Sequence, residues 1–202
     1  MTFTVSDQQV TAGQSVKATV ALGAGPKRRT VRITSDKYGG GGRLLATLTL
    51  QPGEPKTVRY EVGSRVALGA SFAGDATYES RVVRRVVKAE VRINQTMRRW
   101  DDRRNGVHFY ERSDEPLLRV SVRPVKRSEC MQYHIQAKRD SGWKWLAYVE
   151  CYKLNQDSVG GVIYGAGGER RTGTLYRVRS VYPGDRYHVR TGGNWEYFRF
   201  TR

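Results

Sequence analysis

The stretch Val66-Ala-Leu-Gly-Ala-Ser-Phe-Ala-Gly-Asp75, followed by Tyr78, has a counterpart in Leu175-Tyr-Arg-Val-Arg-Ser-Val-Tyr-Pro-Gly-Asp185, followed by Tyr187. In both, an alternating strand pattern reaches an aromatic residue, a spacer and Gly-Asp, and a second strand pattern follows. Glycine tolerates positive φ and aspartate can bond its own backbone, so Gly-Asp between two strand patterns predicts a β-hairpin. Two copies about 110 residues apart predict two domains built on one plan.

The length and the hydrophobic pattern predict an all-β chain of two consecutive antiparallel β-sandwiches. A chain of 202 residues suffices for two sandwiches of about 100 residues each. Alternating runs rich in β-branched residues fill the first half, and turn signals separate them, which is typical of a sandwich. Residues 84–93 alternate without a Pro- or Ser-rich linker, so one strand runs almost directly into the next domain. We therefore expect domains at residues 1–89 and 90–202.

Segments in each half resemble known secreted β-sandwich modules. In the first half the relevant segments, in chain order, are Gln14–Val20, Thr30–Asp36, Leu45–Leu48 and Phe72–Ser80. Their order, and the aromatic-x-Gly-Asp-x-x-Tyr signature from Phe72 to Tyr78, resemble bacterial immunoglobulin-like repeats. This resemblance covers most of residues 1–88 and implies an immunoglobulin-like sandwich that serves surface and secreted proteins as a spacer or adhesive module. It implies no catalytic residues.

In the second half, Ile135-Gln136, Gly142-Trp143 and Gly173–Ser180 resemble the β-sandwich modules appended to secreted actinobacterial proteins. The resemblance covers about residues 130–202 and implies an accessory module without chemistry of its own. Together the two resemblances describe tandem bacterial immunoglobulin-like repeats of the secreted or surface type.

The chain carries a large positive charge in both halves. The net charge is +17 and the pI is about 10.3. Residues 1–90 hold 14 basic and 7 acidic side chains, and residues 91–202 hold 22 and 12. Such a field attracts polyanions, among them nucleic acid, anionic cell-wall polymers, acidic glycans and phospholipid head groups. The alternative is that the arginines are solvated strand faces without a partner.

Cys130 and Cys151 are the only cysteines, and they flank one predicted hairpin. A two-residue turn at Asp140-Ser141 places the cysteines opposite each other, within reach of a disulfide. A three-residue turn that ends at Gly142 instead places them on opposite faces and directs Trp143 and Trp145 to the apolar face. A β-bulge would reconcile the two registers. We expect a disulfide, with two buried thiols as the alternative.

No motif in the sequence points to catalysis, a metal or a cofactor. The three histidines stand in no ligand or triad spacing, two cysteines are too few for zinc, and nucleophile and phosphate-loop motifs are missing. We therefore expect a protein that is not an enzyme, with no cofactor, no metal and no catalytic residues.

Two sets of residues are candidates for a binding site. The first is a basic patch of Arg119, Arg123, Arg177 and Arg179, which requires that their two strands are neighbours in one sheet. The second is an aromatic platform for sugar rings or bases, made of Trp143, Trp145 and Tyr148, which requires the two-residue turn. Packing of the two tryptophans in the core is the alternative to a platform.

These observations favour a non-catalytic extracellular spacer or adhesive module at the cell surface, whose partner is an anionic surface polymer or a protein. The alternative is a structural subunit of a phage or other extracellular particle. The residues after Met1 favour that alternative, since they lack the basic start and apolar core of a signal peptide, whereas a disulfide counts against it. A nucleic-acid binder is a third hypothesis, and charge alone supports it. No apolar run is long enough to predict a transmembrane segment.

Overall fold

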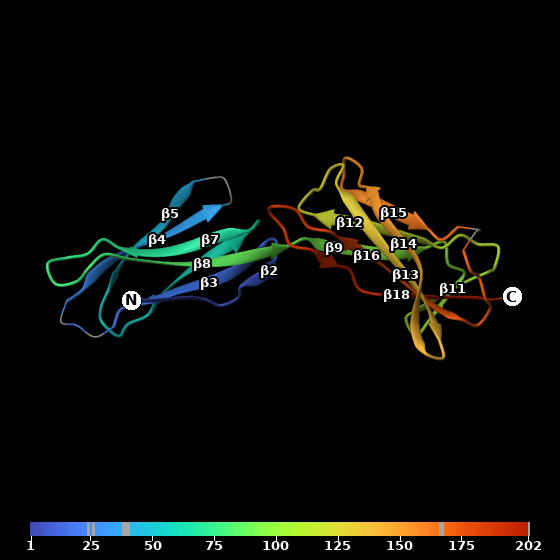
Figure 1. The fold of residues 1–202 in the computed structure, drawn as a ribbon, viewed down its shortest axis with the longest axis horizontal. Coiled ribbons are helices and arrows are strands. Elements are labelled where there is room, and N and C mark those ends of the chain that lie inside the picture. Colours follow the sequence, from blue (N-terminus) through green and yellow to red (C-terminus); the bar gives the residue numbers. More distant parts are fainter. Residues whose placement is uncertain (24, 26, 38–40, 166–167, 202) are drawn as a thin grey trace. The chain divides into compact units, whose positions relative to one another are not determined.

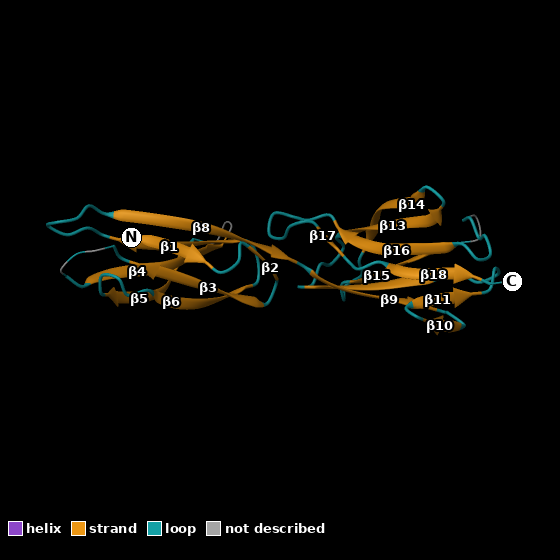
Figure 2. Cartoon of the chain, turned by 90° about the horizontal axis from the view of Figure 1, so that it is seen from below, coloured by secondary structure: helices purple, strands orange, loops and turns teal. Residues whose placement is uncertain are grey.

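The computed structural model describes residues 1–23, 25, 27–37, 41–165 and 168–201 of the chain (Figure 1). Across these residues all regular elements are strands, and no helix is long and apolar enough to cross a membrane (Figure 2). The predicted all-β class is confirmed. The chain forms two compact units: the first is Met1–Glu90 with Asp185–Val189, and the second is Val91–Gly184 with Arg190–Arg202.

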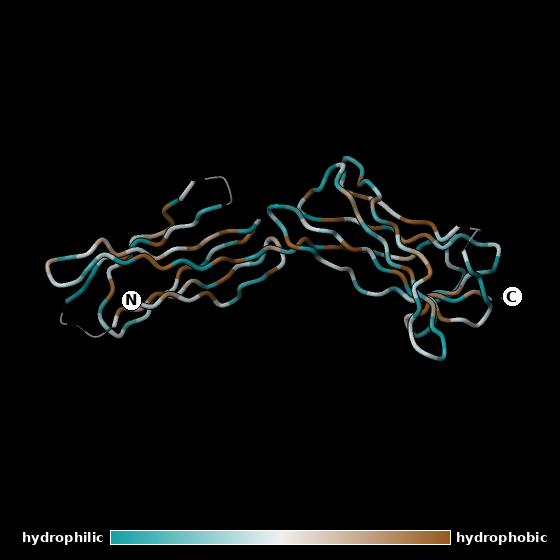
Figure 3. Tube along the Cα trace, viewed as in Figure 1, coloured by the Kyte–Doolittle hydropathy of each residue, from teal (hydrophilic) through white to brown (hydrophobic). Residues whose placement is uncertain are grey.

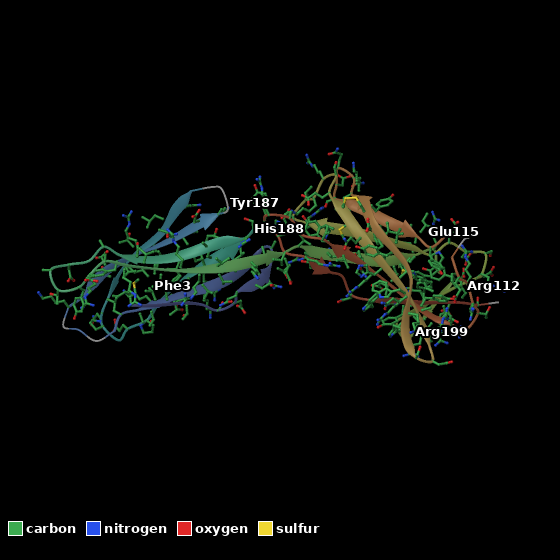
Figure 4. All side chains as sticks on the ribbon, viewed as in Figure 1. Phe3, Arg112, Glu115, Tyr187, His188 and Arg199 are labelled. Atoms are coloured by element: carbon green, nitrogen blue, oxygen red, sulfur yellow. A yellow bond between two sulfur atoms is a disulfide. The ribbon has the colours of Figure 1, made fainter. Side chains whose placement is uncertain are left out.

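One segment differs from the expected domain division. Asp185–Val189 lies in the range expected for the second domain, but it belongs to the first unit. There the backbone N–H of Val189 donates to the Ala89 carbonyl at 2.9 Å, and the Tyr187 carbonyl accepts from the backbone N–H of Arg65 at 2.7 Å. Figure 4 labels Tyr187 of this segment. Strand periodicity cannot reveal such a placement, because it is decided by the backbone partners of a loop.

The first unit contains two sheets. The three-stranded sheet has the order β1-β3-β6, with strands β1 (Thr2–Val5), β3 (Gln14–Ala21) and β6 (Lys56–Val62). The five-stranded sheet has the order β2-β8-β7-β4-β5, with strands β2 (Gln9–Thr11), β8 (Arg81–Glu90), β7 (Val66–Phe72), β4 (Arg29–Lys37) and β5 (Gly42–Leu50). All pairs are antiparallel except β2 with β8.

Alternation along the strands creates the core of the first unit. In β3, Val16, Ala18 and Val20 are buried, while Lys17 between them is exposed and Thr19 is half-buried. Ile33 of β4 and Leu68 of β7 join them in one cluster, so both sheets contribute to the same core. Figure 3 shows the resulting alternation of hydrophobic and hydrophilic residues along the strands. Each fully buried valine or leucine contributes about 1.5–3 kcal/mol to folding.

The second unit also contains two sheets. The larger has the order β10-β11-β18-β16-β13-β14, with β17 beside β16, and consists of β10 (Asp102–Arg104), β11 (Val107–Tyr110), β18 (Glu196–Phe200), β16 (Leu175–Tyr182), β13 (Cys130–Arg139), β14 (Gly142–Lys153) and β17 (Thr191–Gly192). The smaller has the order β15-β12-β9, with strands β15 (Val159–Ile163), β12 (Leu117–Arg123) and β9 (Arg92–Arg98). The pair β11 and β18 is parallel, and the other pairs are antiparallel.

Aromatic residues dominate the core of the second unit. Tyr176 stacks on Phe198 with 5.2 Å between ring centroids, and Phe200 meets Tyr176 edge to face at 5.6 Å. Leu118 of the smaller sheet belongs to the same cluster. The half-buried Gln95 side chain of β9 also joins the two sheets, because its Oε1 accepts hydrogen bonds from the backbone and hydroxyl groups of Ser180 at 3.1 and 2.6 Å.

Both repeated stretches form the predicted hairpins. In the first unit β7 pairs with β8, and Phe72 lies opposite Arg81. In the second half β16 pairs with β17, and Tyr182 lies opposite Thr191. Eight residues separate the paired ends in each case. The hairpin prediction is therefore confirmed in both copies.

The first loop shows why Gly-Asp is needed there. Gly74 adopts φ of 91°, in the left-handed region that favours glycine. Asp75 Oδ1 then accepts the backbone N–H groups of Thr77 and Tyr78 at 2.8 and 2.9 Å, which closes the turn.

The second loop repeats this arrangement. Gly184 has φ of 94°, and Asp185 Oδ1 accepts the backbone N–H groups of Tyr187 and His188, each at 2.6 Å. The equal loop lengths make His188 the counterpart of Tyr78, although the sequence comparison paired Tyr78 with Tyr187.

Candidate functional site

The hairpin of β13 and β14 provides the frame for the site. Arg139 lies opposite Gly142, so the turn has the two residues Asp140 and Ser141. Further along, the pairing shifts between Ile135 and Gln136 and again between Met131 and Tyr133. The two-residue turn expected from one of the two registers is therefore present, and bulges change the register beyond it.

The predicted disulfide lies at the far end of this hairpin. Cys130 and Cys151 are bonded, with 4.8 Å between their Cα atoms (Figure 4). Cys130 is half-buried and Cys151 is exposed. The two register shifts place Cys130 opposite Lys153, so the disulfide joins Cys130 to the residue two positions before its ladder partner, which points to the same side of the sheet.

The predicted basic patch is divided between the two sheets of the second unit. Arg177 and Arg179 lie on β16 in the larger sheet, whereas Arg119 and Arg123 lie on β12 in the smaller sheet. The prediction of one patch from all four is therefore wrong. Alternation identifies both segments as strands, but it does not say which strands pair.

The two arginines on β12 have separate surroundings. Arg119 borders a shallow polar hollow of about 310 Å³ together with Asn94, Thr96 and Arg98. Arg123 Nη1 donates to the Asp157 carbonyl at 3.0 Å. Neither residue reaches the face that is described next.

Arg177 and Arg179 share the outer face of the larger sheet with the predicted aromatic platform. In the ladder Lys138 lies opposite Trp143, Gln136 opposite Trp145, and His134 opposite Tyr148. Directly paired residues point to the same side of a sheet. On the other side of β13, Gln136 pairs with Arg177 and His134 with Arg179. The platform residues and two of the four arginines therefore meet on one surface, which we call the Arg–aromatic face. Its members are Gln136, His134, Lys138, Trp143, Trp145, Tyr148, Arg177, Arg179, Arg190, Trp195 and Tyr197.

Guanidinium and indole groups alternate along one part of this face. The guanidinium carbon of Arg177 lies 4.0 Å from the ring centroid of Trp143 and 4.1 Å from that of Trp195. The guanidinium of Arg179 packs on the same Trp195 ring at 4.5 Å. These distances are well inside the range of cation–π attraction, so the stacked side chains hold both cations in fixed positions. We call this row of Trp143, Arg177, Trp195 and Arg179 the arginine ladder.

A buried amide fixes the orientation of the first cation. Gln136 Oε1 accepts from Arg177 Nε at 2.8 Å, and Gln136 is 7% exposed. Nε is occupied and two indole rings pack on the guanidinium, so the N–H groups of Nη1 and Nη2, which lie in the plane of the group, remain for a ligand. This in-plane edge is the part of arginine that recognises carboxylate and phosphate groups.

A hollow of about 540 Å³ lies next to the arginine ladder. His134, Trp145, Tyr148 and Arg190 line it, together with residues of β14 between the two aromatic side chains. Trp145 is 57% exposed and Tyr148 is 46% exposed, whereas His134 beneath them is 4% exposed. Trp145 and Tyr148 are therefore available to a ligand. Neither Trp143 nor Trp145 belongs to a hydrophobic core cluster, which was the alternative for the two tryptophans.

The arginines of the face repel one another. Burial lowers the pKa of the Arg179 guanidinium, and the charges of Arg177 and Arg190 lower it further. Burial likewise lowers the pKa of His134, with Arg179 and Arg190 acting in the same direction. Among the described residues none of the three arginines has an acidic partner, and Arg179 Nε is buried without a hydrogen bond. An anion at this face would relieve the repulsion.

Several members of the face were missed from the sequence. Trp195 immediately precedes β18 and has the same parity as Tyr197, which pairs with Arg177, and that parity was the available signal for its side of the sheet. His134 falls on the polar phase of its strand, which predicts a surface residue, but Trp145 and Tyr148 cover it. Gln136 has the same parity as His134, and that parity was the available signal for its place beside the arginines.

The described residues contain no group of three or more metal-ligating side chains. Comparison with family models gives no match, and comparison with curated proteins gives none either.

Proposed function

We propose that this chain is a non-catalytic extracellular binding module of two immunoglobulin-like β-sandwiches, which attaches to an anionic surface polymer through the Arg–aromatic face. The immunoglobulin-like assignment is supported by the paired, mainly antiparallel sheets of each unit and by the repeated Gly-Asp hairpin. The Cys130–Cys151 disulfide supports an oxidising, extracellular compartment.

The observation that carries the proposal is the position of Arg177 between two tryptophans without an acidic partner among the described residues. Holding the half-buried Arg177 and Arg179 next to each other and to Arg190 costs free energy, and solvated strand faces do not require this arrangement. A polyanion would offset the cost by giving each guanidinium a charge-assisted hydrogen bond. The net charge of +17 would add long-range attraction that is sensitive to salt.

The separation of the predicted arginines between two sheets supplies a matched test. Arg177→Gln with Arg179→Gln removes two charges from the Arg–aromatic face, and Arg119→Gln with Arg123→Gln removes two from the other sheet. Binding to immobilised polyanionic polymer is measured at several salt concentrations, with circular dichroism to check folding. We expect the first pair to weaken binding about tenfold or more, and the second by only about two- to threefold. Equal losses in both pairs would show that net charge alone drives binding.

A further inference from the structure

The hollow and the arginine ladder are neighbours on one sheet. His134 lines the hollow, and in the strand register it lies directly opposite Arg179 of the ladder. Arg190 lines the hollow as well, and its charge acts on both Arg179 and His134. A ligand unit in the hollow would therefore place a charged substituent within the field of at least two arginines.

The rings around the hollow are tilted against one another. Trp145 meets the His134 ring at 5.0 Å with an interplanar angle of 77°, and Tyr148 meets it at 5.3 Å and 43°. Proteins that bind single-stranded nucleic acid stack successive flat bases on aromatic faces along the path of the strand. Tilted rings instead form a cup, in which a flat base could cover only one ring at a time.

A pyranose ring fits such a cup better than a base does. It is puckered, and its C–H groups point in several directions with a small positive charge. Aromatic faces carry negative charge, so C–H groups pack favourably against them. Trp145 and Tyr148 are exposed and can receive a sugar, while His134 closes the floor of the hollow.

Resting on the proposed function, we propose that the Arg–aromatic face binds an acidic polysaccharide, with one sugar ring on Trp145 and Tyr148 and its anionic substituent at Arg190 and Arg179. The substituent is a carboxylate or a sulfate, because both accept charge-assisted hydrogen bonds from guanidinium groups. Arg177, held between Trp143 and Trp195, would receive the anionic substituent of the adjoining sugar.

Four probes on the full chain separate the components of this proposal. Oligogalacturonate carries sugar rings with carboxylates, dextran sulfate carries rings with sulfates, poly-L-glutamate carries carboxylates without rings, and dextran carries rings without charge. Isothermal titration should show binding of oligogalacturonate or dextran sulfate at least about tenfold tighter than binding of poly-L-glutamate, with no binding of dextran. The tighter of the two acidic glycans identifies the substituent.

The chain offers matched controls for the two rings. Trp145→Ala with Tyr148→Ala removes the proposed sugar contacts. Trp100→Ala with Tyr152→Ala removes the same two residue types outside the lining of the hollow. Their exposed fractions, 44% and 47%, are comparable with the 57% of Trp145 and the 46% of Tyr148. The first pair should weaken acidic-glycan binding about tenfold, and the second should change it less than about twofold. If the first pair does not fold, Arg190→Gln, a substitution at an exposed residue, should still weaken binding of the acidic glycans.

The outcomes distinguish this proposal from the one on which it rests. Equal affinity for poly-L-glutamate and acidic glycans, unaffected by loss of the rings, would overturn the sugar assignment and leave the polyanion module intact. Tighter binding of a single-stranded oligothymidylate, dependent on Trp145 and Tyr148, would replace the glycan with nucleic acid. Failure to bind any of the anionic probes would overturn both proposals.

Discussion

The smallest features that decide this structure are single glycines at the repeated turns. A Cβ atom on Gly74 would lie 3.0 Å from the Ser80 backbone nitrogen and 3.2 Å from the Tyr78 carbonyl oxygen. The residue also has φ of 91°, which an L-amino acid adopts only with strain. Backbone conformation and available space thus both require glycine at this position.

We expect Gly74→Ala to lower the free energy of unfolding by about 1–3 kcal/mol. Gly63→Ala is the matched control, because a Cβ atom on Gly63 would meet no atom within 4 Å and the φ of this residue is outside the left-handed region. Urea denaturation followed by fluorescence measures both variants. A loss in Gly63→Ala as large as that in Gly74→Ala would refute the argument from loop geometry.

At the same scale, Arg177 and Arg179 show what a residue type alone does not reveal. Arginine is common on solvated strands, and nothing in the local sequence distinguishes these two from Arg119 and Arg123. The difference lies in the indole rings that stack on Arg177 and Arg179, one of which comes from Trp195. Sequence reasoning could propose the cations and the platform separately, but their meeting on one face depends on strand order.

At the scale of the element, the β13–β14 hairpin is the most informative part of the chain. The hairpin and its disulfide were predictable, because alternation is a local property, but the sequence left a two-residue and a three-residue turn open. The bulges at Ile135/Gln136 and Met131/Tyr133 were not predictable, because a bulge forms where packing on neighbouring strands favours an extra residue. The two register shifts run in the same direction, so Cys130 and Cys151 still lie on one face, whereas Trp145 lies on the turn side of both shifts and owes its outward position to the two-residue turn.

The disulfide should contribute substantially to stability, since it links β13 and β14 at the end of the hairpin away from the turn. We expect Cys130→Ser with Cys151→Ser to lower the free energy of unfolding by about 2–4 kcal/mol. Guanidinium denaturation of the oxidised protein and the double variant measures this difference. Wild-type protein assayed with reductant is the control and should behave as the variant does. An unchanged midpoint in the variant would mean that the hairpin is held by its ladder alone.

At the scale of the whole molecule, the dominant physical property is charge. A chain of 202 residues with net charge +17 repels itself, and the repulsion acts against the compact state. At about 0.1 M salt the screening length is about 10 Å, so added salt weakens the repulsion between distant arginines. The same screening weakens attraction to an anionic polymer. Melting without the polymer measures the repulsion, and melting with the polymer measures the attraction.

We expect the melting temperature to rise by about 2–4 °C between low and moderate sodium chloride, which corresponds to about 1 kcal/mol for a chain of this length. Scanning calorimetry of the wild type and of the Arg177→Gln, Arg179→Gln variant measures the effect. The variant keeps a net charge of +15, two less than +17, so its response to salt should be nearly unchanged. An acidic polymer at low salt should stabilise the wild type and lose most of that effect in the variant, because specific attachment needs the Arg–aromatic face. Equal stabilisation of both proteins by the polymer would show that the general field of the molecule binds it, and that the ladder of arginine and tryptophan serves only to hold the sheet together.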